Sequence, residues 1–108
     1  MLNKKDSQAI AEFKKKITHL LGNSLQQLSL FGSKAKGTDQ PDSDIDVLVL
    51  IKDAAHGMVE NILDAAFEVN LKHGVYISPR IITLSVYYHP VWSITPFLRN
   101  LKEQGIAL

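Results

Sequence analysis

The stretch Phe31-Gly32-Ser33-Lys34-Ala35-Lys36-Gly37, followed by Ser43-Asp44-Ile45-Asp46-Val47-Leu48-Val49-Leu50-Ile51, decides the fold of this chain of 108 residues. The uninterrupted apolar run that ends at Ile51 predicts a buried strand. Asp44 and Asp46 are separated by a single residue, so in an extended chain their side chains point to the same face. We therefore expect both carboxylates at one end of a buried strand, where a protein can hold Mg²⁺ beside a phosphate.

A Gly-Ser pair precedes the two aspartates and ends another apolar stretch. Glycine lets the backbone approach a phosphate closely, and backbone N–H groups with a neighbouring hydroxyl can hold phosphate oxygens. These properties predict phosphate binding by Gly32 and Ser33. Lys36 is a cation able to contact phosphate oxygens, and Ser43 is expected beside them chiefly as a residue that orders the turn.

The same stretch contains a second lysine and a pair of glycines. Lys34 could contact the triphosphate or could equally be a solvated surface lysine. A P-loop is excluded, because Gly37 is followed by Thr38 where that motif requires lysine.

The motif resembles that of the nucleotidyltransferase superfamily, which includes DNA polymerase beta, kanamycin nucleotidyltransferase and the minimal nucleotidyltransferases. The matching segments are Leu30-Phe31-Gly32-Ser33, Ala35-Lys36-Gly37 and Ser43-Asp44-Ile45-Asp46. The resemblance implies an α/β nucleotidyltransferase fold, a small mixed β-sheet with helices packed against it. It also implies that Asp44 and Asp46 are the catalytic metal ligands, that the cofactor is Mg²⁺, and that Lys36 stands where relatives often have arginine.

The chain departs from this family at one position. Active members usually carry a third acidic residue on the strand after the second helix, whereas residues Val75–Ser85 contain no Asp or Glu. Ser78, Arg80 or Thr83 could occupy the equivalent place. Serine binds Mg²⁺ more weakly than a carboxylate does and arginine would repel it, so the second metal and the general base stay open.

Hydrophobic periodicity predicts alternating helices and strands along the rest of the chain. The expected helices are Ser7–Leu21, Gly57–Leu71 and Ile94–Glu103, the strands are Leu25–Phe31, Ile45–Ile51 and Val75–Val86, and Thr38–Ser43 and Gly105–Leu108 are a polar loop and a tail. The apolar residues on or near one face of the second helix are Val59, Ile62, Leu63, Ala66 and Phe67. We expect Ser7 or Asp6 to cap the first helix and Pro79 to interrupt the third strand. This order predicts a single α/β domain over residues 1–108.

Composition excludes several classes of protein. The net charge of +1 gives no reason to expect a nucleic-acid binder, and 45% hydrophobic residues are ordinary for a globular domain. Cysteine is absent, which excludes disulfides and thiolate zinc sites, and the 4 histidines show no ligand spacing. The polar N-terminus lacks a signal-peptide pattern and no apolar run is long enough to span a bilayer, so we expect a cytoplasmic protein.

The resemblance implies a nucleotidyltransferase that moves a nucleoside monophosphate, foremost AMP from ATP, onto an acceptor. Minimal members resemble the antitoxin half of toxin–antitoxin pairs, whose partner is a small all-helical HEPN ribonuclease, and some of them add AMP to that partner. We therefore expect a nucleoside triphosphate and either such a helical protein or a second copy of the chain as partners.

Two other functions are compatible with the sequence. The missing third carboxylate favours a catalytically degenerate nucleotidyltransferase fold that neutralises a HEPN-type partner by contact. An aminoglycoside-modifying enzyme would need an acceptor pocket that a chain of 108 residues is too short to build alone.

Overall fold

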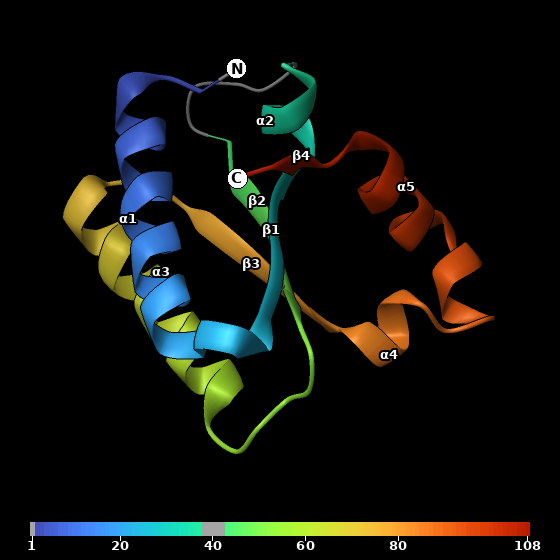
Figure 1. Cartoon of the computed structure of the whole chain (residues 1–108). Coiled ribbons are helices and arrows are strands. Elements are labelled where there is room, and N and C mark those ends of the chain that lie inside the picture. Colours follow the sequence, from blue (N-terminus) through green and yellow to red (C-terminus); the bar gives the residue numbers. More distant parts are fainter. Residues whose placement is uncertain (1, 38–42) are drawn as a thin grey trace.

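The computed structural model describes residues 2–37 and 43–108, apart from the side chains of Ser33 and Lys36. The elements are α1 (Lys4–Leu21), β1 (Leu25–Phe31), α2 (Ser33–Lys36), β2 (Ile45–Ile51), α3 (Met58–His73), β3 (Ile77–Thr83), α4 (Leu84–Tyr87), α5 (Pro96–Gln104) and β4 (Ile106–Ala107). The strand order is β3-β2-β1-β4 (Figure 1). β2 runs parallel to β3 and antiparallel to β1. This mixed sheet with flanking helices confirms the predicted fold class.

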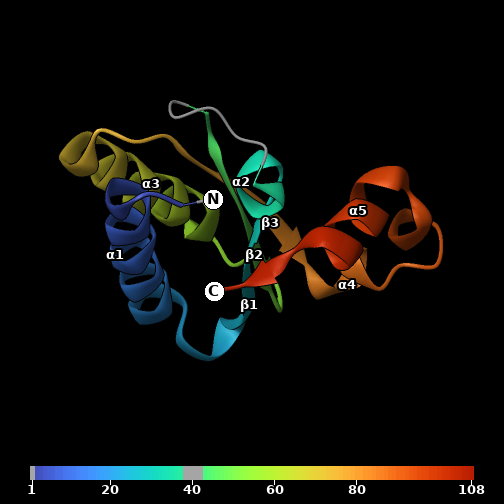
Figure 2. The same cartoon turned by 90° about the horizontal axis from the view of Figure 1, so that it is seen from above.

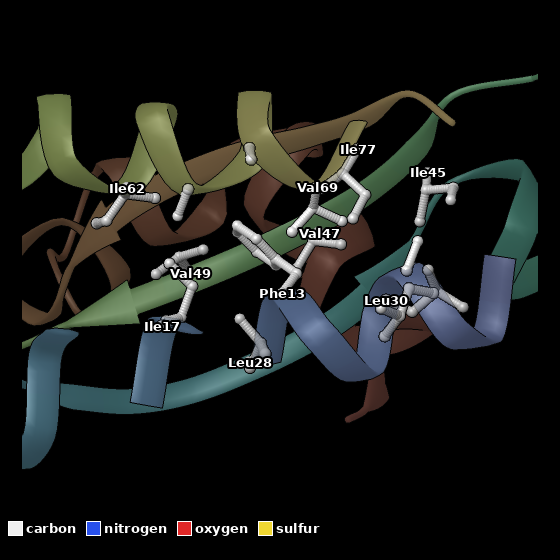
Figure 3. Packing of buried hydrophobic residues seen from close by; sticks show 14 of the residues in the cluster. Phe13, Ile17, Leu28, Leu30, Ile45, Val47, Val49, Ile62, Val69 and Ile77 are labelled. Atoms are coloured by element: carbon white, nitrogen blue, oxygen red, sulfur yellow. The ribbon is translucent and has the colours of Figure 1, made fainter. Parts of the chain in front are cut away.

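α1 and α3 cover one face of the sheet, and side chains from both helices fill the space between. Alternate residues of β2 point to this face, as the pleat of a strand requires. Figure 3 shows Val47 and Val49 among the side chains of Phe13, Ile17 and Ile62, all of which are completely shielded from solvent. Burial of these side chains is the main force that holds the sheet and the two helices together.

α4 and α5 lie on the opposite face of the sheet (Figure 2). The other residues of β2, Leu48 and Leu50, pack there against Leu98 and Leu101 of α5 in a separate, smaller cluster. Since both faces of β2 are buried over most of its length, its sequence is a continuous apolar run rather than an alternating one. Asp46 interrupts this pattern on the α5 side.

Helix α1 begins earlier than the sequence predicts. Its first residue is Lys4, and the Asn3 side chain, not that of Asp6 or Ser7, provides the N-cap by accepting a hydrogen bond of 2.8 Å from the Asp6 N–H. Asparagine is among the strongest capping residues, so the shift of one turn agrees with helix chemistry. The shift places Asp6 inside the first turn, where it is buried.

Helix α3 buries a different stripe from the one that its apolar residues indicate. The inward residues are Ile62, Ala65, Ala66 and Val69, whereas Leu63 and Phe67 are 47% and 56% exposed. The helix carries more apolar residues than one face can bury, so periodicity alone could not choose between two adjacent stripes. None of the described helices is long and apolar enough to cross a membrane.

The third strand and the tail also differ from expectation. β3 passes through Pro79 without a break and ends at Thr83, after which the chain turns into α4. β3 is an edge strand in the described sheet, where a missing N–H is tolerated. Residues Ile106–Ala107 of the expected tail pair with β1 as β4.

Candidate functional site

The site is built around the close approach of Gly32 to Asp46. The antiparallel register places Phe31, the last residue of β1, opposite Asp46 on β2. The chain then turns at Gly32, which has a φ of +74°. A Cβ at this position would come within 2.5 Å of Asp46 Oδ2, so any larger residue would collide with the carboxylate as well as strain the backbone. Glycine is therefore required on both grounds.

Asp46 and Asp44 form a pair of like charges at the start of β2. Asp44 is exposed and immediately precedes the strand, whereas Asp46 is half-buried. Burial raises the pKa of Asp46, the charge of Asp44 raises it further, and the Arg80 guanidinium opposes both. A divalent cation offsets the repulsion between two neighbouring carboxylates, so this donor set fits Mg²⁺.

Lys34 does not act at the predicted site. Its Nζ lies 2.9 Å from Asp6 Oδ2, and the two side chains are only 1% and 4% exposed. This buried ion pair connects the first turn of α1 to α2, the short helix that follows Gly32. Both sequence expectations for Lys34, triphosphate contact and surface solubility, are therefore wrong.

A signal for this pair was present in the sequence. Asp6 occupies the same helical stripe as Ile10, Phe13 and Ile17, at intervals of four, three and four residues. A carboxylate on the buried stripe of a helix requires a buried partner. The sequence could therefore have predicted that Asp6 has a buried partner. It could not have identified that partner as Lys34, which lies 28 residues away.

The remaining predicted phosphate ligands are placed only in part. Ser33 and Lys36 form the first and last residues of α2, and their side chains lie outside the described part of the structure. Ser43 is half-buried and lies just before Asp44. Most of the expected Thr38–Ser43 loop, residues 38–42, also falls outside the described residues.

The parallel register between β2 and β3 settles which residues face the aspartates. Ser78 lies opposite Asp46, whereas Thr83 lies opposite Ile51 at the other end of the strand. Thr83 is therefore excluded as a neighbour of the site. Within residues 2–37 and 43–108, no group of three or more His, Cys, Asp or Glu side chains could hold a metal ion.

A small hollow adjoins the site on the α5 side. It has a volume of about 170 Å³ and is lined by Phe31, Gly32, Phe97, Asn100, Leu101 and Gln104. The rings of Phe31 and Phe97 meet edge to face, with centroids 6.2 Å apart. The turn at Gly32 is therefore open to a ligand between the sheet and α5.

Comparisons with known proteins agree with this geometry. The family model described as "Nucleotidyltransferase domain" matches residues 10–104. Two relatives come from Methanocaldococcus jannaschii. "Putative protein adenylyltransferase MJ0141" is 39% identical over 94% of this chain and 96% of its own length, and "Putative protein adenylyltransferase MJ0604" is 29% identical over 95% and 97%.

Solved structures share the fold at lower identity. A chain in the crystal structure of a toxin–antitoxin with AMP-PNP superposes with a TM-score of 0.58 and 23% identity, over 88% of this chain and 68% of that one. Spectinomycin adenyltransferase AAD(9) from Enterococcus faecialis, solved with ATP and spectinomycin, gives a TM-score of 0.60 and 24% identity, over 77% of this chain and 36% of that one. The matched family model and the fold lead to one conclusion: the chain belongs to the nucleotidyltransferase domain family and is an enzyme of that class, as its sequence motifs predict.

Proposed function

We propose that this protein transfers AMP from ATP to a hydroxyl group of a protein partner, with Mg²⁺ bound at Asp44 and Asp46. The observation that carries the proposal is the contact between the Gly32 turn and the Asp46 carboxylate. It places an open backbone turn, suited to phosphate oxygens, directly beside a pair of carboxylates suited to a divalent cation. A nucleoside triphosphate carrying Mg²⁺ satisfies both halves of this site.

In this proposal, different residues of the chain bind the phosphates and the cation. Gly32 and Ser33 hold phosphate oxygens, Lys36 adds positive charge beside them, and Ser43 orders the turn before the aspartates. Asp44 and Asp46 fix the position of the cation and, with it, that of the triphosphate. When bound, Mg²⁺ neutralises the phosphates and stabilises the charge that develops on the leaving group.

The transfer is a substitution at the α-phosphorus of ATP. The acceptor oxygen forms a bond to this phosphorus, the bond to the β-phosphate oxygen breaks, and pyrophosphate leaves with the electron pair. The acceptor proton passes to a base or to solvent. Catalysis of this reaction depends mostly on positioning and on electrostatic stabilisation, which is what two fixed carboxylates and an adjacent phosphate-binding turn provide.

The acceptor is proposed to be a small helical protein of the HEPN type, in a toxin–antitoxin pair. The names of the two archaeal relatives support a protein acceptor, and the toxin–antitoxin crystal structure supports a protein partner within such a pair. The net charge of +1 also suits a protein better than bare nucleic acid. In this proposal residues 1–108 act as one nucleotidyltransferase domain, in the cytoplasm.

Label transfer from α-³²P-ATP tests the proposal. Lysate of cells that lack the gene is incubated with Mg²⁺ and purified wild-type protein, Asp46→Asn or Asp53→Asn. Asp53 is an exposed aspartate just beyond the other end of β2, which makes it a matched control. We expect one labelled protein with wild type and Asp53→Asn, and at least 100-fold less label with Asp46→Asn. Equal labelling by Asp46→Asn would refute the assigned metal site.

A second candidate function is favoured by the serine opposite Asp46. A site with Ser78 in place of a third carboxylate suits a protein that binds nucleotide without turnover and neutralises its partner by contact. Absence of label with all four nucleoside triphosphates, together with Mg²⁺-dependent nucleotide binding, would support this function. Neutralisation of the partner would then survive in Asp44→Asn and Asp46→Asn proteins.

A further inference from the structure

Arg80 lies on β3 at the edge of the candidate site. In the parallel register, Ser78 is opposite Asp46 and Arg80 is opposite Leu48. Arg80 therefore lies two residues beyond Ser78 on β3 and on the same face of the sheet. The neighbouring residues confirm the orientation. Ile81 packs with the cluster under α1 and α3, whereas Ile82 packs with the cluster under α5, the side on which Asp46 lies. Arg80 therefore projects from the same face as the aspartates.

The guanidinium of Arg80 has no carboxylate partner in the described part of the chain. No ion pair within 4.0 Å involves it, and the residue is exposed. The register places it two residues along β3 from Ser78, the residue opposite Asp46, and on the same face of the sheet. The arrangement is thus an exposed cation near an acidic pair with which it forms no ion pair.

We propose that Arg80 binds phosphate oxygens of the nucleoside triphosphate and supplies positive charge beside the metal held by Asp44 and Asp46. This inference rests on the proposed function, because it assigns a further substrate-binding residue to the same site. Arginine suits the task, since its planar group is always charged and donates paired hydrogen bonds to phosphate.

The charge balance of the site favours this assignment over a purely structural one. An exposed arginine that supported the fold through a salt bridge would pair with a carboxylate, and no such pair within 4.0 Å involves Arg80 among the described residues. A cation at this position also disfavours a second metal ion nearby, so the triphosphate needs another source of positive charge. A guanidinium that projects into the site provides it without a third carboxylate.

The test is nucleotide binding by the full chain, measured by calorimetry with Mg²⁺ present. The ligands are ATP, AMP and adenosine, and the proteins are wild type, Arg80→Ala, Arg80→Lys and Arg80→Glu. Arg99→Ala is the matched control, because Arg99 is the other arginine of the chain and is also exposed. Thermal unfolding of each variant verifies that the exposed substitutions leave the fold intact.

We expect Arg80→Ala to weaken ATP binding by at least 10-fold and to change adenosine binding by less than 2-fold, as is typical of the loss of a charge-assisted phosphate contact. Lysine should restore part of the affinity, and glutamate should weaken it further. ATP binding that is unchanged in Arg80→Ala would overturn the inference while leaving the proposed function in place. If wild type itself binds no nucleoside triphosphate, both proposals fail.

Discussion

Asp6 with Lys34, and Asp46 with Arg80, are two combinations of an acidic and a basic residue that differ in burial. Asp6 and Lys34 are in contact at 2.9 Å and almost completely shielded from solvent. Asp46 is half-buried and Arg80 is exposed, and no ion pair within 4.0 Å joins them in the described structure. The first pair has satisfied its charges within the protein. The second keeps charge available for a ligand.

The comparison shows that residue type alone does not assign a role. Lys34 belongs to the motif segment and Arg80 does not, yet Lys34 is a structural residue and Arg80 is the one beside the aspartates. A buried charged side chain requires a partner because its desolvation is costly. A solvated charged side chain is stable without a partner and can bind a ligand. Burial, which depends on the packing of distant elements, therefore decides between structure and function here.

The largest expected effect comes from breaking the buried pair. Replacing Lys34 by alanine leaves the Asp6 carboxylate buried without this cation, which should cost about 3–5 kcal/mol of the free energy of unfolding. Urea denaturation measures this loss. Lys16→Ala, which removes the exposed pair with Glu68, is the control and should have a much smaller effect.

The double variant Asp6→Leu/Lys34→Met sharpens the same test. Removing both charges together should recover most of the stability that either single substitution loses, because no unpaired charge stays in the core. A loss of stability in the double variant equal to the sum of the losses in the two single variants would contradict a direct interaction between the side chains.

A smaller effect is expected at the Gly32 turn. Gly32→Ala should lose about 1–2 kcal/mol from the left-handed backbone conformation, and its Cβ would also displace the Asp46 carboxylate. Gly57→Ala is the matched control, since Gly57 has a φ of +78° and open space around its Cβ position. Both variants should lose comparable stability, but only Gly32→Ala should lose AMP transfer. Activity in Gly32→Ala equal to that of the control would show that the contact is unimportant.

The smallest effect concerns the pH dependence of stability at the open pair. Burial and the charge of Asp44 raise the pKa of Asp46 above its ordinary value of 3.8. The folded protein therefore binds this proton more tightly than the unfolded chain does, so the free energy of unfolding falls as pH rises from about 4 through the folded pKa. Asp46→Asn should flatten this part of the profile and unfold at an equal or slightly higher temperature than wild type at pH 7.

Added Mg²⁺ gives a readout at the same position. Saturating Mg²⁺ at pH 7 should raise the unfolding temperature of wild type, because a ligand that binds only the folded state stabilises it. Asp46→Asn should show little or no such shift. An identical shift in both proteins would place the cation elsewhere.

The sequence by itself determined the local parts of the site. The apolar run of β2 predicts its burial, the spacing of Asp44 and Asp46 places both at one end of it, and Gly32 marks the turn. These features depend on short-range geometry, on the two-residue period of a strand and on the conformational freedom of glycine. Such rules hold regardless of how the rest of the chain packs, and the family match agrees with them.

Only the tertiary structure decided the role of each residue that depends on a distant partner. Lys34 is structural because Asp6 of α1 meets it, and Arg80 reaches the site because β3 pairs with β2 in one particular register. Likewise, the packing of α3 against α1 and the sheet determines which of its side chains are buried. Ile106 and Ala107 form β4 because they pair with β1. Periodicity shows which side chains share a face, but not which elements meet. Contacts between segments far apart in the chain are set by the packing of the whole core, and local sequence does not encode them.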